Sequence, residues 1–328
     1  MIWSLSTFSA CCFAWQTTSR ELVDLQFAAD NSLIILVSAP GATEPGIYRW
    51  RRGEAEPKLL CHLASPVSFS FDRKSVVERV AEPAPELRIY DASTCAPRSR
   101  IPVDGAVLDA DARGKLVAAA FRLPDHSRVL RLYTMNGRAL ASTAIGANVE
   151  IGFTSDGRSL LNFDLNDGGL RAWQLPTLAD QPLPRWLGVG ELTFVPGSPL
   201  VKRYVNDTLT LHRWPGGAPV FAMALSRAPR IRQLSASGRY GLAHVKNGDG
   251  EALEWLDFPG KRRVRLAVGS VDHAAINGAG NRVAWTSRTL HSEGTAHAVQ
   301  VQFATLDGDG RVAGENDTSV ADRAPTRQ

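Results

Sequence analysis

The sequence predicts an all-β fold, a seven-bladed β-propeller with four antiparallel strands in each blade. Three observations predict it. A turn pair recurs at a nearly constant interval, an alternating strand with an aromatic end follows at a fixed distance, and the 328 residues accommodate seven such units. Four short strands in a repeat of about 40 residues are the pattern of a propeller blade.

The turn pairs follow apolar strands along the whole chain. They are Asp30-Asn31, Asp72-Arg73, Arg113-Gly114, Asp156-Gly157, Pro196-Gly197, Ser237-Gly238 and Gly280-Asn281. Successive pairs begin 42, 41, 43, 40, 41 and 43 residues apart, which indicates seven copies of one unit.

An alternating strand ends in an aromatic residue 17 to 20 residues after each of the first six turns. These ends are Trp50, Tyr90, Tyr133, Trp173, Trp214 and Trp255. The seventh strand ends at Phe303, 23 residues after its turn, because a longer loop, 287–297, precedes it. Alternation at period two is what a strand with one buried face requires.

The chain ends are expected to close the ring and to leave a tail. Residues 1–306 form a single predicted propeller, in which the apolar residues 2–15 complete the last blade as its outermost strand. Residues 307–328 are polar and Gly-rich and are expected to be disordered. A secretory signal is the alternative interpretation of the apolar run, but no Lys or Arg precedes it, and it is shorter than the roughly 20 residues that span a bilayer.

The repeats resemble those of WD-repeat proteins and related bacterial propellers. The resemblance covers about Leu22 to Phe303 and depends on the period, the aromatic strand ends and turns such as FTSDGR, LSASGR and DARGK. It departs from the strict pattern, because no repeat has a Gly-His dipeptide and no strand ends in Trp-Asp; the nearest is IYDAS, from Ile89 to Ser93. The resemblance implies a propeller fold and an interaction scaffold, without the Asp–His network of that family.

Charge and cysteine content favour a cytoplasmic chain that does not bind nucleic acid. The net charge is +4, and the basic residues are scattered apart from RWRR (49–52) and KRR (261–263). Nucleic-acid binding normally needs a coherent basic face. Cys11, Cys12, Cys61 and Cys95 form no C-x-x-C pair and no zinc-type spacing, so we expect reduced thiols, with a periplasmic or exported protein as the alternative.

The strand that precedes each turn is expected to be innermost and to line the central channel. Polar channel candidates on these strands are Asp24, Asp109, Asp111, Glu150, Glu191, Arg232 and His273. Such a set could bind a cation or a polar small molecule, as a sensor or an enzyme would. The simpler interpretation is that a water-filled channel needs polar side chains without any further function.

No motif predicts catalytic residues, a metal or a cofactor. His291, Glu293 and His297 share one loop, and KNGDGE (246–251) and LDGDG (306–310) have a weak likeness to calcium loops, but solvated loops and hairpin turns explain them. Nucleophile-elbow, phosphate-loop and dinucleotide-binding motifs are absent from the sequence.

We therefore expect a non-catalytic, monomeric scaffold, without a membrane span, that binds a protein or peptide through loops on one rim. The loops between the second and third strand of each blade differ in length and charge, as binding loops on a rigid frame do. The rim candidates are Arg122, Asp125, His126, Lys246, Asp249, Arg288, His291 and Glu293.

Overall fold

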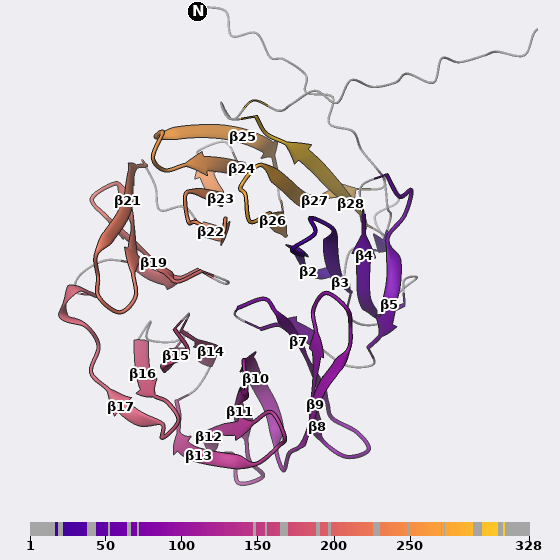
Figure 1. Ribbon diagram of the computed structural model, residues 1–328, viewed down its shortest axis with the longest axis vertical. Helices are drawn as coiled ribbons and strands as arrows, with labels where there is room; N and C mark the ends of the chain where they lie inside the picture. The colour runs from indigo at the N-terminus through magenta and orange to yellow at the C-terminus, as the bar shows by residue number, and fades with distance from the viewer. Residues whose placement is uncertain are drawn as a thin grey trace, which may run out of the picture.

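A computed structural model shows seven four-stranded antiparallel sheets arranged as blades around a ring (Figure 1). It describes residues 17–18, 22–37, 44–51, 53–63, 67–70, 72–146, 149–154, 156–164, 170–187, 191–195, 198–225, 230–247, 250–269, 271, 273–290, 297–307 and 311. The predicted fold class, an all-β seven-bladed propeller, is confirmed.

The strands of the first four blades run in chain order from the channel outward. Blade 1 contains β2 (Leu22–Phe27), β3 (Leu33–Val37), β4 (Gly46–Trp50) and β5 (Lys58–His62). Blade 2 contains β6 (Val67–Phe69), β7 (Ser75–Val80), β8 (Glu86–Asp91) and β9 (Pro97–Pro102). Blade 3 contains β10 (Ala106–Arg113), β11 (Leu116–Arg122), β12 (Arg128–Thr134) and β13 (Ala139–Ala144). Blade 4 contains β14 (Val149–Phe153), β15 (Ser159–Asp164), β16 (Leu170–Gln174) and β17 (Ala179–Gln181).

A 3-10 turn, η1 (Arg185–Leu187), precedes the last three blades. Blade 5 contains β18 (Glu191–Phe194), β19 (Leu200–Val205), β20 (Thr208–Arg213) and β21 (Pro219–Ala224). Blade 6 contains β22 (Arg230–Leu234), β23 (Tyr240–Asn247), β24 (Gly250–Asp257) and β25 (Arg262–Val268). Blade 7 contains β26 (Ala274–Ile276), β27 (Arg282–Leu290), β28 (His297–Thr305) and, outermost, β1 (Thr17–Thr18).

The two rims of the ring carry different connections, because strand direction reverses at every step within an antiparallel blade. Loops between second and third strands, together with the connections from one blade to the next, lie on one rim, which we call the loop rim. Turns between first and second strands, and between third and fourth strands, lie on the opposite rim, the turn rim. The loop between β11 and β12, residues 123–127, therefore belongs to the loop rim.

The predicted turn pairs adopt a shared backbone conformation. The second residue of five pairs has a positive φ, between 58° and 71°: Asn31, Arg73, Gly114, Gly157 and Gly238. In the seventh pair the positive φ falls on Gly280, at 83°, while Pro196-Gly197 lies outside the described residues. Left-handed backbone favours Gly and Asn, which explains why those residues mark the repeat.

The core lies between neighbouring blades. Leu25 and Trp50 of blade 1 belong to one buried cluster with Ala284 and Val301 of blade 7, so the first and last blades pack together. The ring of Phe303 lies edge-on to that of Trp50, with centroids 5.1 Å apart. Stacking blades in this way buries the apolar faces that a lone four-stranded sheet would expose.

The closing strand of blade 7 comes from early in the chain. Thr17 pairs with Val299, and Thr18 pairs with Ala298. Residues 2–15, which the sequence analysis assigns to this strand, lie outside the described residues, so their role stays a prediction. Of the predicted tail, the structure describes only residues 307 and 311. Asp307 Oδ1 accepts a hydrogen bond from Arg311 N (2.8 Å).

The expectation of reduced thiols is wrong for one pair of cysteines. Cys61 of β5 and Cys95, in the turn between β8 and β9, form a disulfide between blades 1 and 2, with Cα atoms 6.2 Å apart. The two residues are 34 positions apart and form no motif, so only the stacking of the blades brings them together. Within the described part of the chain, no helix is long and apolar enough to cross a membrane.

Candidate functional site

Two channel candidates, Asp109 and Asp111 of β10, form hydrogen bonds between blades. The innermost strand of a blade has no neighbouring strand on its channel side. Its backbone N–H and C=O groups on that side therefore need other hydrogen-bond partners. Asp109 Oδ2 accepts a hydrogen bond from Ile151 N (2.8 Å), and Asp111 Oδ2 accepts one from Phe153 N (2.7 Å). Both donors belong to β14 of the next blade. The two carboxylates therefore bind the innermost strand of blade 4 to that of blade 3.

The same kind of link recurs elsewhere in the ring. Gln233 Oε1 of blade 6 accepts a hydrogen bond from Ile276 N of blade 7 (2.7 Å). Asp24 Oδ2 of blade 1 accepts two from the Arg73 guanidinium of blade 2 (2.6 and 2.9 Å). The three links to a backbone N–H join residues 42 or 43 positions apart, one repeat period. A polar side chain on an innermost strand, one repeat period before the corresponding residue of the next innermost strand, is the signal that could have revealed these links in the sequence.

Burial sets the ionisation of Asp109. It raises the pKa of Asp109 to about 6, although hydrogen bonds from Ile151 N and Ala110 N and the charge of Arg79 favour the carboxylate. The negative charge of Glu150, which is exposed, raises the pKa further. Arg79 is held in place by donating a hydrogen bond from its guanidinium to Leu108 O (3.1 Å). Asp109 is therefore partly protonated at mildly acidic pH.

The remaining channel candidates do not converge. An Arg232 guanidinium nitrogen lies 3.5 Å from His244 Nδ1, and His273 N donates to Thr286 Oγ1 (3.2 Å). The side chain of Glu191 lies outside the described residues. Among the residues that are described, no three His, Cys, Asp or Glu side chains are placed to hold a metal ion.

Three of the rim candidates share one rigid loop on the loop rim. Asp125 Oδ1 accepts hydrogen bonds from Ser127 N (3.0 Å) and Ser127 Oγ (2.6 Å). Leu123 and Ser127 close the loop through a backbone hydrogen bond (2.9 Å), and His126 adopts a φ of 66° at its tip. Arg122, Asp125 and His126 are all exposed. The bonds from Ser127 hold the pKa of Asp125 below its usual range, so the loop presents a fixed carboxylate, an imidazole and a guanidinium.

The other rim candidates lie elsewhere or cannot be placed. Lys246, exposed and paired with Glu251 at 3.4 Å, belongs to blade 6, across the ring from blade 3 (Figure 1). Arg288 is part of β27, but its side chain lies outside the described residues, as do Asp249, His291 and Glu293 entirely. The described candidates thus form one compact group on blade 3 and one separate residue, rather than a continuous surface.

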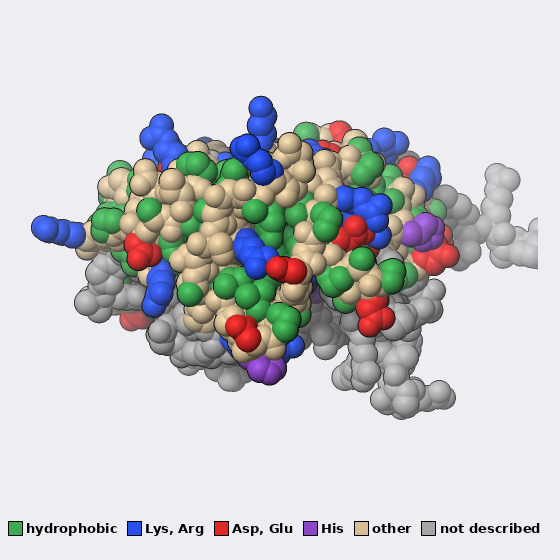
Figure 2. All heavy atoms as spheres, turned by 90° about the horizontal axis from the view of Figure 1, so that it is seen from below, with side chains coloured by type: hydrophobic (Ala, Val, Ile, Leu, Met, Phe, Trp, Pro, Cys, Tyr) green, Lys and Arg blue, Asp and Glu red, His purple; other side chains and the backbone are tan. Residues whose placement is uncertain are grey.

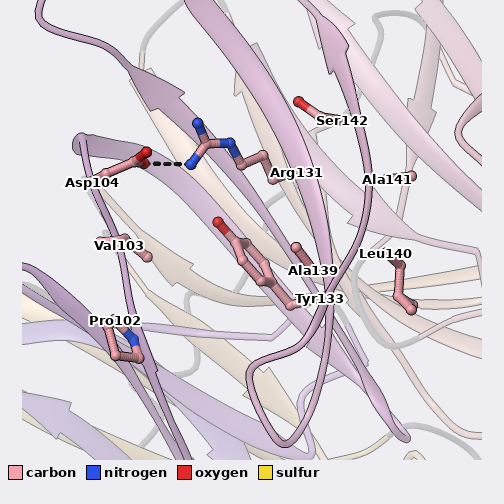
Figure 3. A pocket seen from close by; sticks show the side chains of 9 residues that line it. All are labelled: Pro102, Val103, Asp104, Arg131, Tyr133, Ala139, Leu140, Ala141 and Ser142. Atoms are coloured by element: carbon pink, nitrogen blue, oxygen red, sulfur yellow. Dashed lines mark hydrogen bonds and ion pairs between the residues drawn. The ribbon is translucent and has the colours of Figure 1, made fainter.

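A groove between blades 2 and 3, with a volume of about 590 Å³, has no counterpart in the sequence predictions. Its lining residues are Pro102, Val103, Asp104, Arg131, Tyr133, Ala139, Leu140, Ala141 and Ser142 (Figure 3). Arg131 forms an ion pair with Asp104 at its edge. Alternation alone could not reveal this groove, because its two walls come from different blades.

The fold places the chain in the class of seven-bladed β-propellers. No protein-family model matches the chain, and no curated protein matches it by sequence. A chain in the crystal structure of the mitotic checkpoint complex is similar in fold, with a TM-score of 0.54 and 12% sequence identity. The match covers 92% of this chain and 98% of that one. At this identity the likeness shows a shared propeller architecture.

Proposed function

We propose that the protein is a non-catalytic scaffold that binds a protein or peptide through its loop rim. The observation that carries the proposal is the loop from Arg122 to Arg128, in which internal hydrogen bonds hold Asp125 and His126 exposed on a rigid blade. Binding residues are commonly placed on loops supported by a rigid frame, because a preformed loop loses little conformational entropy on binding.

Two further observations support a scaffold. Propellers commonly act as interaction platforms, and the similar solved chain belongs to a protein complex. The carboxylates of Asp109 and Asp111, the strongest candidates for a ligand site in the channel, are engaged by backbone donors of the next blade. We expect the scaffold to act as a monomer, which sedimentation over a range of protein concentrations tests.

The rim is tested by a variant that changes its charge while keeping the loop. Arg122→Glu, Asp125→Asn and His126→Asn are combined, because Asn preserves the side-chain turn at position 125 and tolerates the positive φ at position 126. The matched control is Arg158→Glu, an exposed residue of the turn rim. Partners are captured from the source cell and quantified by mass spectrometry.

We expect the rim variant to lose its captured partners by about tenfold or more, and the control to retain them. Equal capture by both variants, with unchanged circular dichroism, would remove the rim as the binding surface.

The cytoplasmic location stays a prediction, and the Cys61–Cys95 disulfide favours the exported alternative. Disulfides persist in oxidising compartments, whereas the cytosol keeps thiols reduced. Locating the protein by cell fractionation, with alkylation of free thiols before lysis, separates the two.

A further inference from the structure

The outermost strand of blade 3, β13, lacks the features that normally protect an exposed sheet edge. Its sequence, ALASTA, contains no charged residue and no proline. The other described outermost strands of three or more residues each contain one or the other: β5, β9, β17, β21 and β25. Charges and prolines at an edge discourage another chain from pairing with it. β13 is thus the most open edge among these strands.

The backbone groups of β13 that face away from its blade can be assigned. Ile145 N donates to Arg128 O on β12 (3.1 Å), so the backbone groups of Ile145 point inward. Alternate residues of a strand point these groups in opposite directions, which directs those of Ser142 and Ala144 outward. Both residues are exposed. Two residues of β13 therefore offer donors and acceptors to an added strand.

The groove described above lies directly beside this edge. Ser142 pairs with Arg131 across the sheet, and Ala139 pairs with Tyr133, so these side chains share the face that lines the groove. The small side chains of Ala139 and Ser142 leave room above Tyr133 (Figure 3). An added strand would place every second side chain in this space.

Blades 2 and 3 also contact each other outside the residues that line the groove. Ser99 Oγ of blade 2 donates a hydrogen bond to Met135 O of blade 3. Near it, a Cβ atom at Gly137 would lie 3.7 Å from Arg100 O. Blades 2 and 3 are therefore in direct contact beyond the residues that line the groove.

The charged lining residues Arg131 and Asp104 pair with each other, so the positive charge available to a bound acidic side chain comes from this pair together with the exposed Arg138 nearby. The Arg131 side chain is 24% exposed and lies over the Phe121 ring at 5.5 Å, while its partner Asp104 is 65% exposed. Arg138, at the start of the same hairpin arm, is also exposed. Figure 2 views the side of the molecule on which blade 3 lies, where hydrophobic side chains are interspersed with backbone, other polar groups and charged side chains of both signs. An uncharged strand with one carboxylate opposite Ser142 fits this surface.

We propose that β13 binds an extended segment of a partner protein as a fifth strand of blade 3. The backbone of the segment pairs with Ser142 and Ala144, its apolar side chains enter the groove, and an acidic side chain reaches Arg131. Main-chain hydrogen bonds supply affinity in this mode of recognition, and alternate side chains supply specificity. The groove reaches the loop rim at Val103 and Asp104, but its lining contains none of the three residues changed in the rim variant, which is therefore expected to leave the site intact.

The probe is a fluorescein-labelled, end-blocked peptide, Thr-Val-Thr-Glu-Thr-Val-Thr, with binding measured by fluorescence anisotropy. The test variant is Ala144→Pro, which removes an outward N–H without removing a bond to β12. Its matched control is Ala224→Pro on β21, the outermost strand of blade 5. Leu225 N donates to Asp207 O (2.8 Å), just as Ile145 N donates to Arg128 O, so the N–H of Ala224 points away from its blade as that of Ala144 does. Ser142→Lys, which adds a charge to the edge, is a second variant if the proline variant fails to fold.

We expect Ala144→Pro or Ser142→Lys to weaken binding about tenfold or more, while Ala224→Pro stays within about twofold of the parent. A peptide with Lys in place of Glu should bind at least about threefold more weakly. Absence of peptide binding at about 1 mM, or equal binding by Ala144→Pro and Ala224→Pro, overturns the proposal. A concentration-dependent doubling of mass that Ala144→Pro abolishes overturns it too, because a second copy of the chain would then occupy the edge.

Discussion

Replacing Asp109 with Asn should change how the stability of the propeller depends on pH. Burial raises the pKa of Asp109 from its ordinary 3.8 to about 6 in the folded protein. Between these values the folded protein binds more protons than the unfolded chain, so stability falls as pH rises. The stability that protonated Asp109 contributes is complete below pH 3.8 and is lost as pH rises through about 6.

The size of this effect follows from the shift. A rise of about two pKa units corresponds to about 3 kcal/mol in the free energy of unfolding. The Asn side chain is uncharged at every pH and has one oxygen acceptor in place of two. The variant therefore loses one of the two hydrogen bonds from Ile151 N and Ala110 N, which lowers its free energy of unfolding by about 1 kcal/mol at every pH. The stability of the variant relative to the parent should therefore increase by about 3 kcal/mol between pH 4 and pH 7.5.

Urea unfolding followed by tryptophan fluorescence at several pH values measures this difference. Asp125→Asn is the matched control, because Asp125 lies on the surface and its pKa is lowered, so its titration falls below this range. Parallel stability profiles for Asp109→Asn and the parent would refute the reasoning, as would an Asp109 carboxyl titration near pH 4 by nuclear magnetic resonance.

Two further predictions concern contacts within and between blades. Gly217→Ala should lower the free energy of unfolding by about 2 to 4 kcal/mol, since φ is 72° and the new Cβ would lie 2.3 Å from the Trp186 ring. Gly53→Ala, with φ of 83° and open space around it, should cost only about 1 kcal/mol by the same denaturation measurement, and equal losses would contradict the role of Trp186. Cys61→Ser should lower stability by about 3 to 4 kcal/mol, because the disulfide closes a loop across 34 positions. The intact mass of the parent after alkylation without reductant should show two alkylated cysteines, because Cys61 and Cys95 are protected by their disulfide. Four alkylated cysteines would contradict the disulfide.

Much of the propeller could be predicted from the sequence because its signals are local. The positive φ of Asn31 and Gly157 depends on the residue itself, and the aromatic strand ends Trp50 and Trp255 are buried as their pattern predicts, although β4 and β24 are buried on both faces rather than on one. Both recur with each unit, so the period reveals the number of blades and the order of strands within each blade. The innermost strands were identified in this way and are confirmed as β2, β6, β10, β14, β18, β22 and β26.

The functions of polar residues were less predictable. Asp109 and Asp111 were correctly placed on an innermost strand, but their polarity suggested a ligand site or a solvated channel rather than acceptors for Ile151 and Phe153. The loop holding Asp125 is predicted from its place between the second and third strands and from its charge, while its rigidity depends on bonds to Ser127 that neither feature shows.

Sequence alone thus determined the repeating unit, because turn conformation and strand alternation depend on neighbours in the chain. Only the tertiary structure decided which residues meet between blades and at their edges: the bond from Cys61 to Cys95, the pairing of Thr17 and Thr18 with Val299 and Ala298, and the groove beside β13. Each of these joins residues from different parts of the chain. Their contact depends on the angle and stacking of whole sheets around the ring, which no pattern within a single repeat specifies.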